Sequence, residues 1–358
     1  MTPPLCPIPL PTPSDEAPNG EQTAPKIDPG AALYLLIKRQ YGMYSGAEVE
    51  QIDRFLPSAP HLVEGLIPPG SVNILVGDSG IGKSPMAYQL GLAVAGGVPF
   101  LGLPAREGKV LFLDYENMSG DARRIATQQR KHVGLKAASP NFLLWLMPAT
   151  SDGEHESVES IVKQLAPDLV IIDSLRAFHP EMESTSVEAV RQIRAFRAIA
   201  KKQGTAFLLI HHVRRQQLLA TADLENGHAL DWLRRASGVR ALINQTDVRL
   251  ALGVRNTGED LVLGGHYRTR GAIGPYLIRR AYNTDGEPTG YARFEPDPAL
   301  IANGEQETAF AELPTDFSFA IAQGTLRKPP ETTNQFIHKL VRLGLARKVA
   351  RGKYQKSL

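Results

Sequence analysis

The sequence predicts an α/β fold: a mostly parallel sheet with an antiparallel extension, followed by a small basic C-terminal domain. Short apolar runs alternate with helical stretches between residues 72 and 210, which is the pattern of a parallel sheet with crossover helices. Strand-like runs without intervening helices follow between residues 248 and 294, and they predict antiparallel strands. Near Ala302 the composition turns polar and a separate segment begins.

The composition is that of an ordinary globular protein, with 358 residues, 42% hydrophobic and 22% charged. A net charge of +3 is too small to identify a partner. The single cysteine, Cys6, excludes an internal disulfide framework and a cysteine-rich zinc site. No apolar run approaches the length of a membrane span and no secretory leader pattern is present. We therefore expect a cytoplasmic protein without membrane contact.

Two segments are expected before the main domain. Residues 1–28 carry eight prolines and few large apolar side chains, a composition that predicts a disordered tail. Residues 29–66 are predicted to form a helical lead-in, because apolar residues such as Leu35, Tyr41 and Phe55 recur there. The main domain is expected to span residues 67–301 and the basic C-terminal domain residues 302–358.

The main domain is expected to contain alternating strands and helices, followed by further strands. The expected parallel strands are Val72–Val76, Val110–Leu113, Phe142–Leu146, Leu169–Ile172 and Ala206–Ile210. The expected helices are Pro85–Ala95, Gly120–His132, Ser157–Leu165 and Val187–Lys202. The expected antiparallel strands are Val248–Leu252, Leu261–Gly265, Tyr276–Arg280 and Tyr291–Phe294.

The first strand is followed by a phosphate-binding motif of the form G-x-x-x-x-G-K-[ST]. Its glycines let successive backbone N–H groups face a polyphosphate, and the helix that follows adds its positive dipole end. Lys83 is expected to reach the β- and γ-phosphates of ATP and Ser84 to bind Mg²⁺. The expected nucleotide-binding residues are Gly77, Asp78, Ser79, Gly80, Ile81, Gly82, Lys83, Ser84 and Pro85.

Carboxylates at strand ends supply the second requirement of nucleotide hydrolysis, because Mg²⁺ needs an anionic partner and the attacking water must be positioned. Asp173 ends an apolar strand and is the Walker B candidate, a second Mg²⁺-binding residue with Ser84. Asp114 and Glu116 follow the preceding strand on one side of it. We select Glu116 as the residue that activates water and keep Asp114 as the alternative.

Two histidines, His211 and His212, end the strand that begins at Ala206. Ligands of open α/β sheets bind at this carboxyl edge. Because neighbouring side chains of a strand point to opposite faces, one histidine can face the γ-phosphate while the other packs in the core. We select His212 as the phosphate sensor.

The C-terminal segment resembles half of a winged helix. A linker is expected at 303–307, a short helix at Phe317–Gln323, a longer helix from Pro329-Pro330, and a two-stranded wing at Ala346–Gln355. Phosphate contacts from such a segment would supply affinity for DNA, and a solvated basic tail or a subunit contact is the alternative. Its basic residues are Arg327, Lys328, Lys339, Arg342, Arg347, Lys348, Arg351, Lys353 and Lys356.

Between Gly70 and Phe294 these motifs resemble those of the RecA-fold ATPases, and among them the RepA-type plasmid replicative helicases, which form hexameric rings. The resemblance rests on the P-loop, Glu116, the run Ile172–His179 and the paired histidines. It implies a RecA-like core and Mg²⁺-dependent ATP hydrolysis. Leu233–Asp247 with Ser237-Gly238 looks like the corresponding part of DnaB-type helicases. Arg268-Thr269-Arg270 matches a pair that reaches the ATP of the adjacent subunit, so the resemblance implies Arg270, with Arg268 beside it, as an arginine finger.

The sequence therefore predicts an ATP-driven motor that assembles as a homo-oligomeric ring, a hexamer in such families, around single-stranded DNA. A second set of basic residues lies outside the C-terminal segment and consists of Arg214, Arg215, Arg234, Arg235 and Arg240. In the RecA-like family, loops in this region face the central DNA channel. An ATP-switched DNA-binding regulator without unwinding activity is the first alternative, and a small-molecule kinase is the second.

Overall fold

The computed structural model describes residues 45–50, 59–146, 154–212, 224, 228–236, 240–254, 260–295 and 304–357. The chain divides into two compact units, residues 1–58 and 59–358. In the first, α2 (Gly46–Val49) is capped by Ser45, which exchanges hydrogen bonds with Glu48. The tail 1–28 lies outside the described residues. Within the ranges above, no helix is long and apolar enough to cross a membrane.

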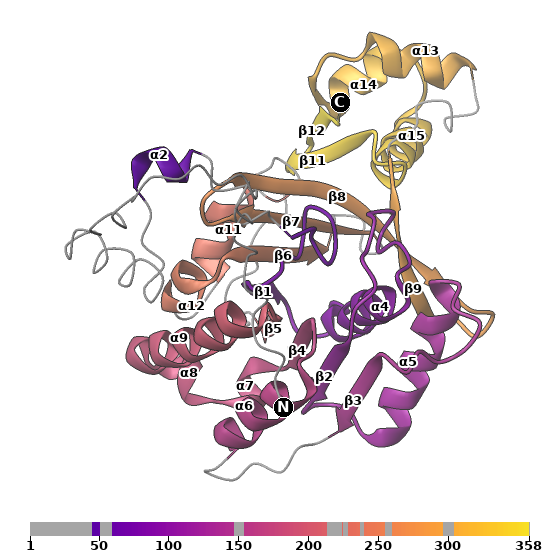
Figure 1. The fold of residues 1–358 in the computed structure, drawn as a ribbon. Coiled ribbons are helices and arrows are strands. Elements are labelled where there is room, and N and C mark those ends of the chain that lie inside the picture. Colours follow the sequence, from indigo (N-terminus) through magenta and orange to yellow (C-terminus); the bar gives the residue numbers. More distant parts are fainter. Residues whose placement is uncertain are drawn as a thin grey trace, which may run out of the picture. The chain divides into compact units, whose positions relative to one another are not determined.

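The second unit contains a nine-stranded sheet in the order β3-β2-β4-β5-β1-β6-β7-β8-β9 (Figure 1). The strands from β3 to β6 in this order run parallel, and β7, β8 and β9 continue the sheet antiparallel. The strand bounds are β1 Val72–Gly77, β2 Val110–Asp114, β3 Phe142–Leu146, β4 Leu169–Asp173, β5 Ala206–His212, β6 Val248–Val254, β7 Leu261–Tyr267, β8 Gly271–Tyr282 and β9 Pro288–Phe294. The predicted α/β fold with a large, mostly parallel sheet is therefore confirmed.

Helices cover both faces of the sheet because its central strands are apolar on both sides. In β1, Leu75 packs in the core beneath α4 and α5, whereas Ile74 and Val76 pack in the core on the other face. That face is covered by α6, α9, α11 and α12 (Figure 1). The bounds are α4 Lys83–Gly96, α5 Ser119–His132, α6 Glu154–Leu165, α9 Ser186–Gln203, α11 Ala229–Ala236 and α12 Arg240–Gln245.

The structure corrects several of the expected elements. Residues 59–66 form turns and a bridge between Val63 and Ile67, not a helix. β6, expected to be antiparallel, runs parallel to β1. The helices α11 and α12 precede it and return the chain to the end of the sheet where β1 begins. Two short helices follow β4, α7 (Leu175–Phe178) and α8 (Glu181–Ser184). Residues 304–307, expected in a linker, begin α13 (Gly304–Glu312), because Ala309 and Phe310 bury its far end.

The C-terminal segment has its own apolar core, in which Phe310, Phe336 and Leu340 are buried. The element order is α13, β10 (Asp316–Ser318), α14 (Phe319–Leu326), α15 (Pro330–Arg342), β11 (Ala346–Ala350) and β12 (Lys353–Lys356). The three strands form a sheet in the order β10-β12-β11. The predicted helix at Phe317–Gln323 begins two residues late, because Ser318 ends β10 and caps α14 through its side chain.

Candidate active site

The phosphate-binding loop joins the end of β1 to the start of α4, as its motif predicts. Gly82 has a φ of +104°, and a Cβ atom at this position would lie 2.3 Å from the Tyr291 hydroxyl, so glycine is required. Lys83 is buried, and its Nζ atom donates to the carbonyl oxygens of Gly77 at 3.0 Å and Asp78 at 2.7 Å. The lysine is therefore folded back onto the loop that carries it.

His212 connects the loop to a carboxylate. β5 lies beside β1 with His212 opposite Gly77. The Nδ1 atom of His212 lies 3.1 Å from the Lys83 Nζ atom, and its Nε2 atom lies 3.0 Å from Oε1 of Glu116. An ammonium group only donates, so Nδ1 is the nitrogen that can accept from Lys83, and Nε2 is the nitrogen that can donate to Glu116. The neighbouring His211 is buried.

Glu116 and Asp114 have different surroundings although they follow the same strand. Asp114 is fully buried, and it accepts hydrogen bonds from the backbone N–H groups of Glu116 and Asn117 and from the Tyr88 hydroxyl at 2.6 Å. It thus shapes the turn that presents Glu116. The Glu116 side chain is one-third exposed, and the His212 hydrogen bond holds its pKa below the usual range. Glu116 is therefore the carboxylate that faces the loop.

Asp173 lies at the end of β4, opposite Asp114 in the strand register. Its side chain is fully buried, and burial raises its pKa to about 7, assisted by the charges of Glu116 and Asp114. The nearby Ser84 hydroxyl opposes this shift, but within the described residues neither Asp173 oxygen has a hydrogen-bond partner. Burial likewise lowers the pKa of Lys83 to about 8. A buried carboxylate beside a hydroxyl group is an oxygen donor set that suits Mg²⁺, so Ser84 and Asp173 fit the predicted ion.

Two side chains that sequence reasoning did not select hold the phosphate-binding loop from the antiparallel strands. Arg280 on β8 donates through Nη2 to the Ile81 carbonyl at 2.8 Å, and the Tyr291 hydroxyl on β9 donates to the Gly82 carbonyl at 3.0 Å. Both lie in runs that predicted strands, and no local motif distinguishes them. They bond to two carbonyl groups of the loop and thereby tie it to the antiparallel part of the sheet.

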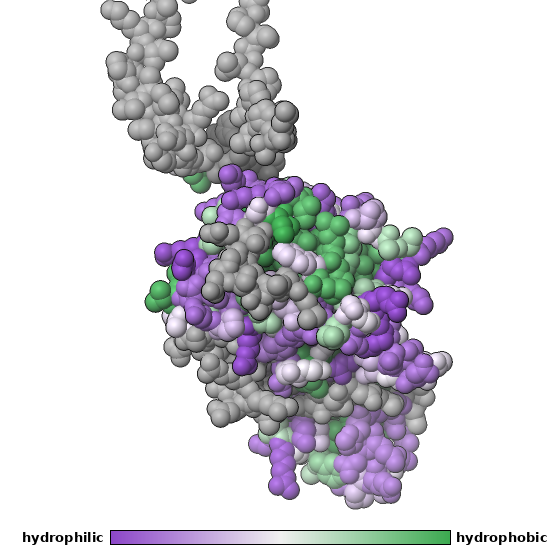
Figure 2. All heavy atoms as spheres, turned by 90° about the horizontal axis from the view of Figure 1, so that it is seen from below, coloured by the Kyte–Doolittle hydropathy of each residue, from purple (hydrophilic) through white to green (hydrophobic). Residues whose placement is uncertain are grey.

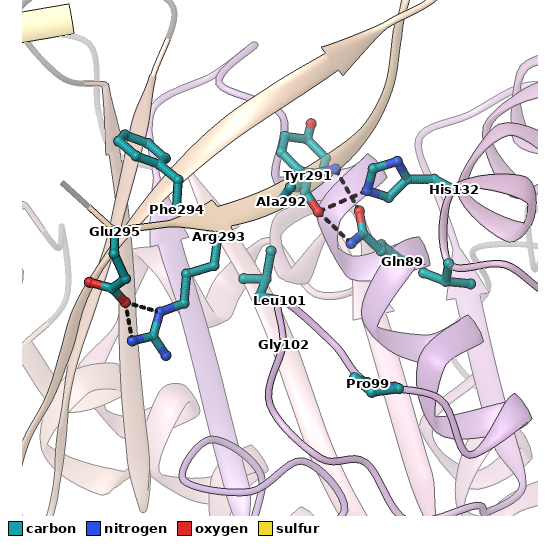
Figure 3. A pocket seen from close by; sticks show the side chains of 11 residues that line it. Gln89, Pro99, Leu101, Gly102, His132, Tyr291, Ala292, Arg293, Phe294 and Glu295 are labelled. Atoms are coloured by element: carbon teal, nitrogen blue, oxygen red, sulfur yellow. Dashed lines mark hydrogen bonds and ion pairs between the residues drawn. The ribbon is translucent and has the colours of Figure 1, made fainter. Parts of the chain in front are cut away.

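The backbone of Tyr291 is fixed as well (Figure 3). Gln89 on α4 accepts from the Tyr291 N–H and donates to its carbonyl, both at 2.8 Å, and His132 Nε2 donates to the same carbonyl at 3.0 Å. These residues border a cavity of about 510 Å³ that continues along Arg293 and Glu295. β9 is thereby attached to the helix that carries Lys83.

Arg268 and Arg270 lie in the exposed turn between β7 and β8. Arg268 pairs with Asp247 at 3.2 Å, and Asp247 also accepts from the backbone N–H of Val72, the first residue of β1. The turn is therefore at the start of β1, whereas the phosphate-binding loop follows its end. A six-residue strand separates them by about 20 Å, so neither arginine reaches the loop of its own chain.

The predicted basic set near the loops is described only in part. Arg234 lies on α11 and is exposed, while Arg214 and Arg215 lie outside the described residues, as does Ser237-Gly238. For Arg235 and Arg240 the structure describes only the helical backbone of α11 and α12.

The chain is similar to a known protein family and to several DNA repair proteins. Residues 39–217 match the model of a family described as AAA domain. DNA repair protein RadA of Halalkalibacterium halodurans is 25% identical over 178 residues, which cover 49% of this chain and 35% of that protein. The RadA proteins of Pseudomonas aeruginosa and Chlamydia muridarum are each 28% identical, over 48% and 61% of this chain and 35% and 45% of theirs. The chain thus spans less than half the length of these relatives.

A solved structure, the RadB recombinase, superimposes with a TM-score of 0.44 at 20% identity, covering 63% of this chain and 92% of that one. The family match and the RadA relatives support a RecA-like P-loop ATPase domain.

Proposed function

Since the chain belongs to the AAA domain family, we propose that it is an ATP-hydrolysing DNA motor, a helicase or translocase that assembles as a homo-oligomeric ring. The observation that carries the proposal is the continuous contact from Lys83 through His212 to Glu116, beside the buried Asp173. These are the parts that phosphoryl transfer to water requires: a cation for the phosphates, an acidic partner for Mg²⁺ and a carboxylate to position water.

The residues divide the work in the following way. The loop amides and Lys83 would hold the β- and γ-phosphates, and Ser84 with Asp173 would hold Mg²⁺, which neutralises charge on the phosphates when bound. Glu116 is kept ionised by His212 and orients the attacking water. His212 touches both Lys83 and Glu116, so a change in the position of the lysine when phosphate binds is transmitted to the carboxylate. His212 thus acts as the phosphate sensor.

Two observations support assembly from several copies of the chain. Arg270 is exposed at the opposite edge of the sheet from its own phosphate-binding loop, which is the placement that a finger acting on a neighbouring subunit needs. β3 is an edge strand, and its five side chains, among them Phe142, Leu144 and Trp145, are all half-buried. Apolar surface is gathered on the face seen in Figure 2. An apolar edge of this kind is suited to contact with another subunit.

DNA is the partner that the relatives and the charge distribution favour. The RadA proteins are named as DNA repair proteins. In the C-terminal segment, the hairpin of β11 and β12 carries exposed Lys348, Arg351 and Lys353. The order of helices and strands there supports a winged-helix-like domain, in which α15 and this hairpin contact the phosphate backbone.

The test measures ATP turnover with and without single-stranded DNA, together with strand separation and particle mass in solution. We expect DNA to stimulate turnover of a ring-sized particle, and Lys83→Ala to abolish turnover while the protein stays folded. ATP-dependent binding to duplex DNA, without stimulated turnover or strand separation, would instead establish the alternative of an ATP-switched regulator. Turnover of Lys83→Ala at the wild-type rate would refute the proposed site.

A further inference from the structure

A cluster of metal-binding side chains lies outside the nucleotide site, in the segment that follows β4. His179 follows α7 as its C-cap, Glu181 begins α8, and Glu188 lies in the first turn of α9. One potential ligand atom from each residue lies within 4.8 Å of the others. His179 Nε2 and Glu188 Oε1 are 2.9 Å apart. Three different helices therefore bring an imidazole and two carboxylates to one point.

Glu188 is held firmly at this point. It lies at the start of an 18-residue helix whose N-cap, Thr185, accepts from the Glu188 N–H at 3.3 Å. Gln192, one turn later, donates to the Glu188 Oε1 atom at 2.7 Å. A hydrogen bond from such a neighbour fixes the orientation of a carboxylate ligand. The Glu188 side chain is only 14% exposed, so its position is set by the helix and not by solvent.

His179 is held by the residue before it. Phe178 is buried, and its ring lies 6.1 Å from Phe196 of α9 and 5.5 Å from Tyr115. The backbone N–H of His179 donates to the Leu175 carbonyl at 2.8 Å. The imidazole thus lies beside Glu188 and next to a packed aromatic group, while Glu181 is exposed.

We propose that His179, Glu181 and Glu188 form a site for a divalent transition-metal ion, with Zn²⁺ as the best match. Two carboxylates offset the charge of a divalent cation, and the imidazole nitrogen favours Zn²⁺ over Mg²⁺ or Ca²⁺, which prefer oxygen ligands. Tetrahedral zinc with bonds of 2.0–2.2 Å places its ligand atoms roughly 3.4 Å apart. The ion therefore requires only small side-chain rotations, and a fourth position remains open to water.

The positive charge of Arg191 lies next to the cluster. Arg191 is 3.6 Å from Glu188 Oε2, and its side chain is 77% exposed. An exposed pair of this kind contributes little free energy, so the arginine can turn into solvent when the ion binds. The bound ion would join the segment after β4 to α9. Asp173 ends β4 just before this segment, and Phe178 contacts Tyr115, the residue before Glu116. The cluster is therefore linked to the nucleotide site through two neighbouring residues, although it uses none of that site's residues.

The experiment titrates Zn²⁺ into nucleotide-free protein that has been treated with a chelator, following heat by calorimetry and the unfolding midpoint by thermal denaturation. We compare wild type with Glu181→Gln, which replaces an exposed carboxylate by an amide of the same volume. The matched control is Glu159→Gln on α6, which makes the same replacement outside the cluster. We expect one high-affinity ion and a raised midpoint in wild type and in Glu159→Gln. In Glu181→Gln the affinity falls at least tenfold and the stabilisation is lost.

Further arms identify the ion's position. Substitution with Co²⁺ gives an absorption spectrum that reports a nitrogen ligand, and this signature should change in His179→Gln. If Glu116→Gln, and not Glu181→Gln, removes the binding, the ion occupies the nucleotide site and the proposal is wrong. Equal affinities in wild type and Glu181→Gln overturn it as well. Either result leaves the proposed ATPase function standing, since that function rests on other residues.

Discussion

The Nδ1 atom of His212 lies 3.1 Å from the Nζ atom of Lys83, and the opposite ring nitrogen lies 3.0 Å from Glu116. One imidazole therefore touches both the phosphate-binding lysine and the carboxylate proposed to position water. The parallel register of β5 on β1, which sets His212 opposite Gly77, creates this contact. It makes the ionisation of Glu116 depend on a residue from a distant part of the sequence.

We expect His212→Ala to change the pH dependence of turnover. The hydrogen bond from His212 is the main cause of the lowered Glu116 pKa, so its removal raises that pKa. The ionised carboxylate positions water, so turnover falls when Glu116 is protonated. On acidification, the variant should therefore lose turnover at a higher pH than wild type does. Turnover measured between about pH 4 and pH 8 checks this, and an unchanged acidic limb would contradict the proposed contact.

Glu116→Gln and Asp114→Asn are expected to fail in different ways. Glu116→Gln should bind ATP but hydrolyse it about 10²- to 10⁴-fold more slowly, the usual contribution of a positioned base. Asp114→Asn should lower stability by about 1–3 kcal/mol, because its new amide donor faces the Tyr88 hydroxyl and the Asn117 amide.

Nucleotide binding, single-turnover hydrolysis and urea unfolding of both variants separate these outcomes. Trapped ATP in Asp114→Asn, with normal turnover in Glu116→Gln, would reverse the two assignments.

Asp173→Asn should stabilise the nucleotide-free protein at high pH. Burial raises the Asp173 pKa from 3.8 to about 7, so between these values the folded state binds a proton that the unfolded state lacks. Stability from this group is therefore full below about pH 4 and is lost as the pH rises towards 7. Urea unfolding should show Asp173→Asn more stable than wild type by a few kcal/mol at pH 8 and little changed at pH 4.

The exposed Asp285→Asn serves as the control, since it removes a carboxylate without removing a buried charge. A stabilisation of Asp173→Asn that is the same at both pH values would mean that the buried charge is not its cause.

Much of this architecture could be predicted because its signals are local in the sequence. The phosphate-binding loop is a contiguous motif, and Asp173 and His212 each end an apolar run whose parallel direction brings them to one edge. Arg280 and Tyr291 could not be selected, because they meet the loop across about 200 residues of sequence. α13 lies where the sequence predicts a linker, because its first turn is polar and only Ala309 and Phe310 are buried.

Tyr291→Phe tests the attachment of β9 to the phosphate-binding loop. The change removes only the hydroxyl that donates to the Gly82 carbonyl at 3.0 Å, and one such hydrogen bond is worth about 0.5–1.5 kcal/mol. We expect the KM for ATP to rise about 2- to 10-fold with little change in the unfolding midpoint. Tyr282→Phe, an exposed tyrosine on neighbouring β8, is the matched control. Equal KM values for the two variants would show that the hydroxyl does not position the loop.

Arg270 provides the sharpest test of the ring. It is exposed at the end of the sheet where β1 begins, about 20 Å from the phosphate-binding loop of its own chain. Any role of Arg270 in hydrolysis must therefore be exerted on the ATP of a neighbouring subunit. Arginine fingers contribute about 10³- to 10⁵-fold to turnover, and Arg270→Ala should therefore nearly abolish hydrolysis while ATP binding persists through Lys83 and Ser84. Arg268→Ala, which breaks the pair with Asp247 in the same turn, should reduce turnover less.

The decisive measurement mixes subunits that carry Arg270→Ala with subunits that carry Lys83→Ala, each of which is expected to be inactive by itself. In a mixed ring, some interfaces join an intact lysine on one subunit to an intact arginine on the next, so part of the turnover should return. The recovered activity should vary with the mixing ratio and reach a maximum near equal amounts, because only mixed interfaces contain both groups. If co-assembled mixtures recover no activity, Arg270 does not act between subunits and the ring mechanism loses its basis.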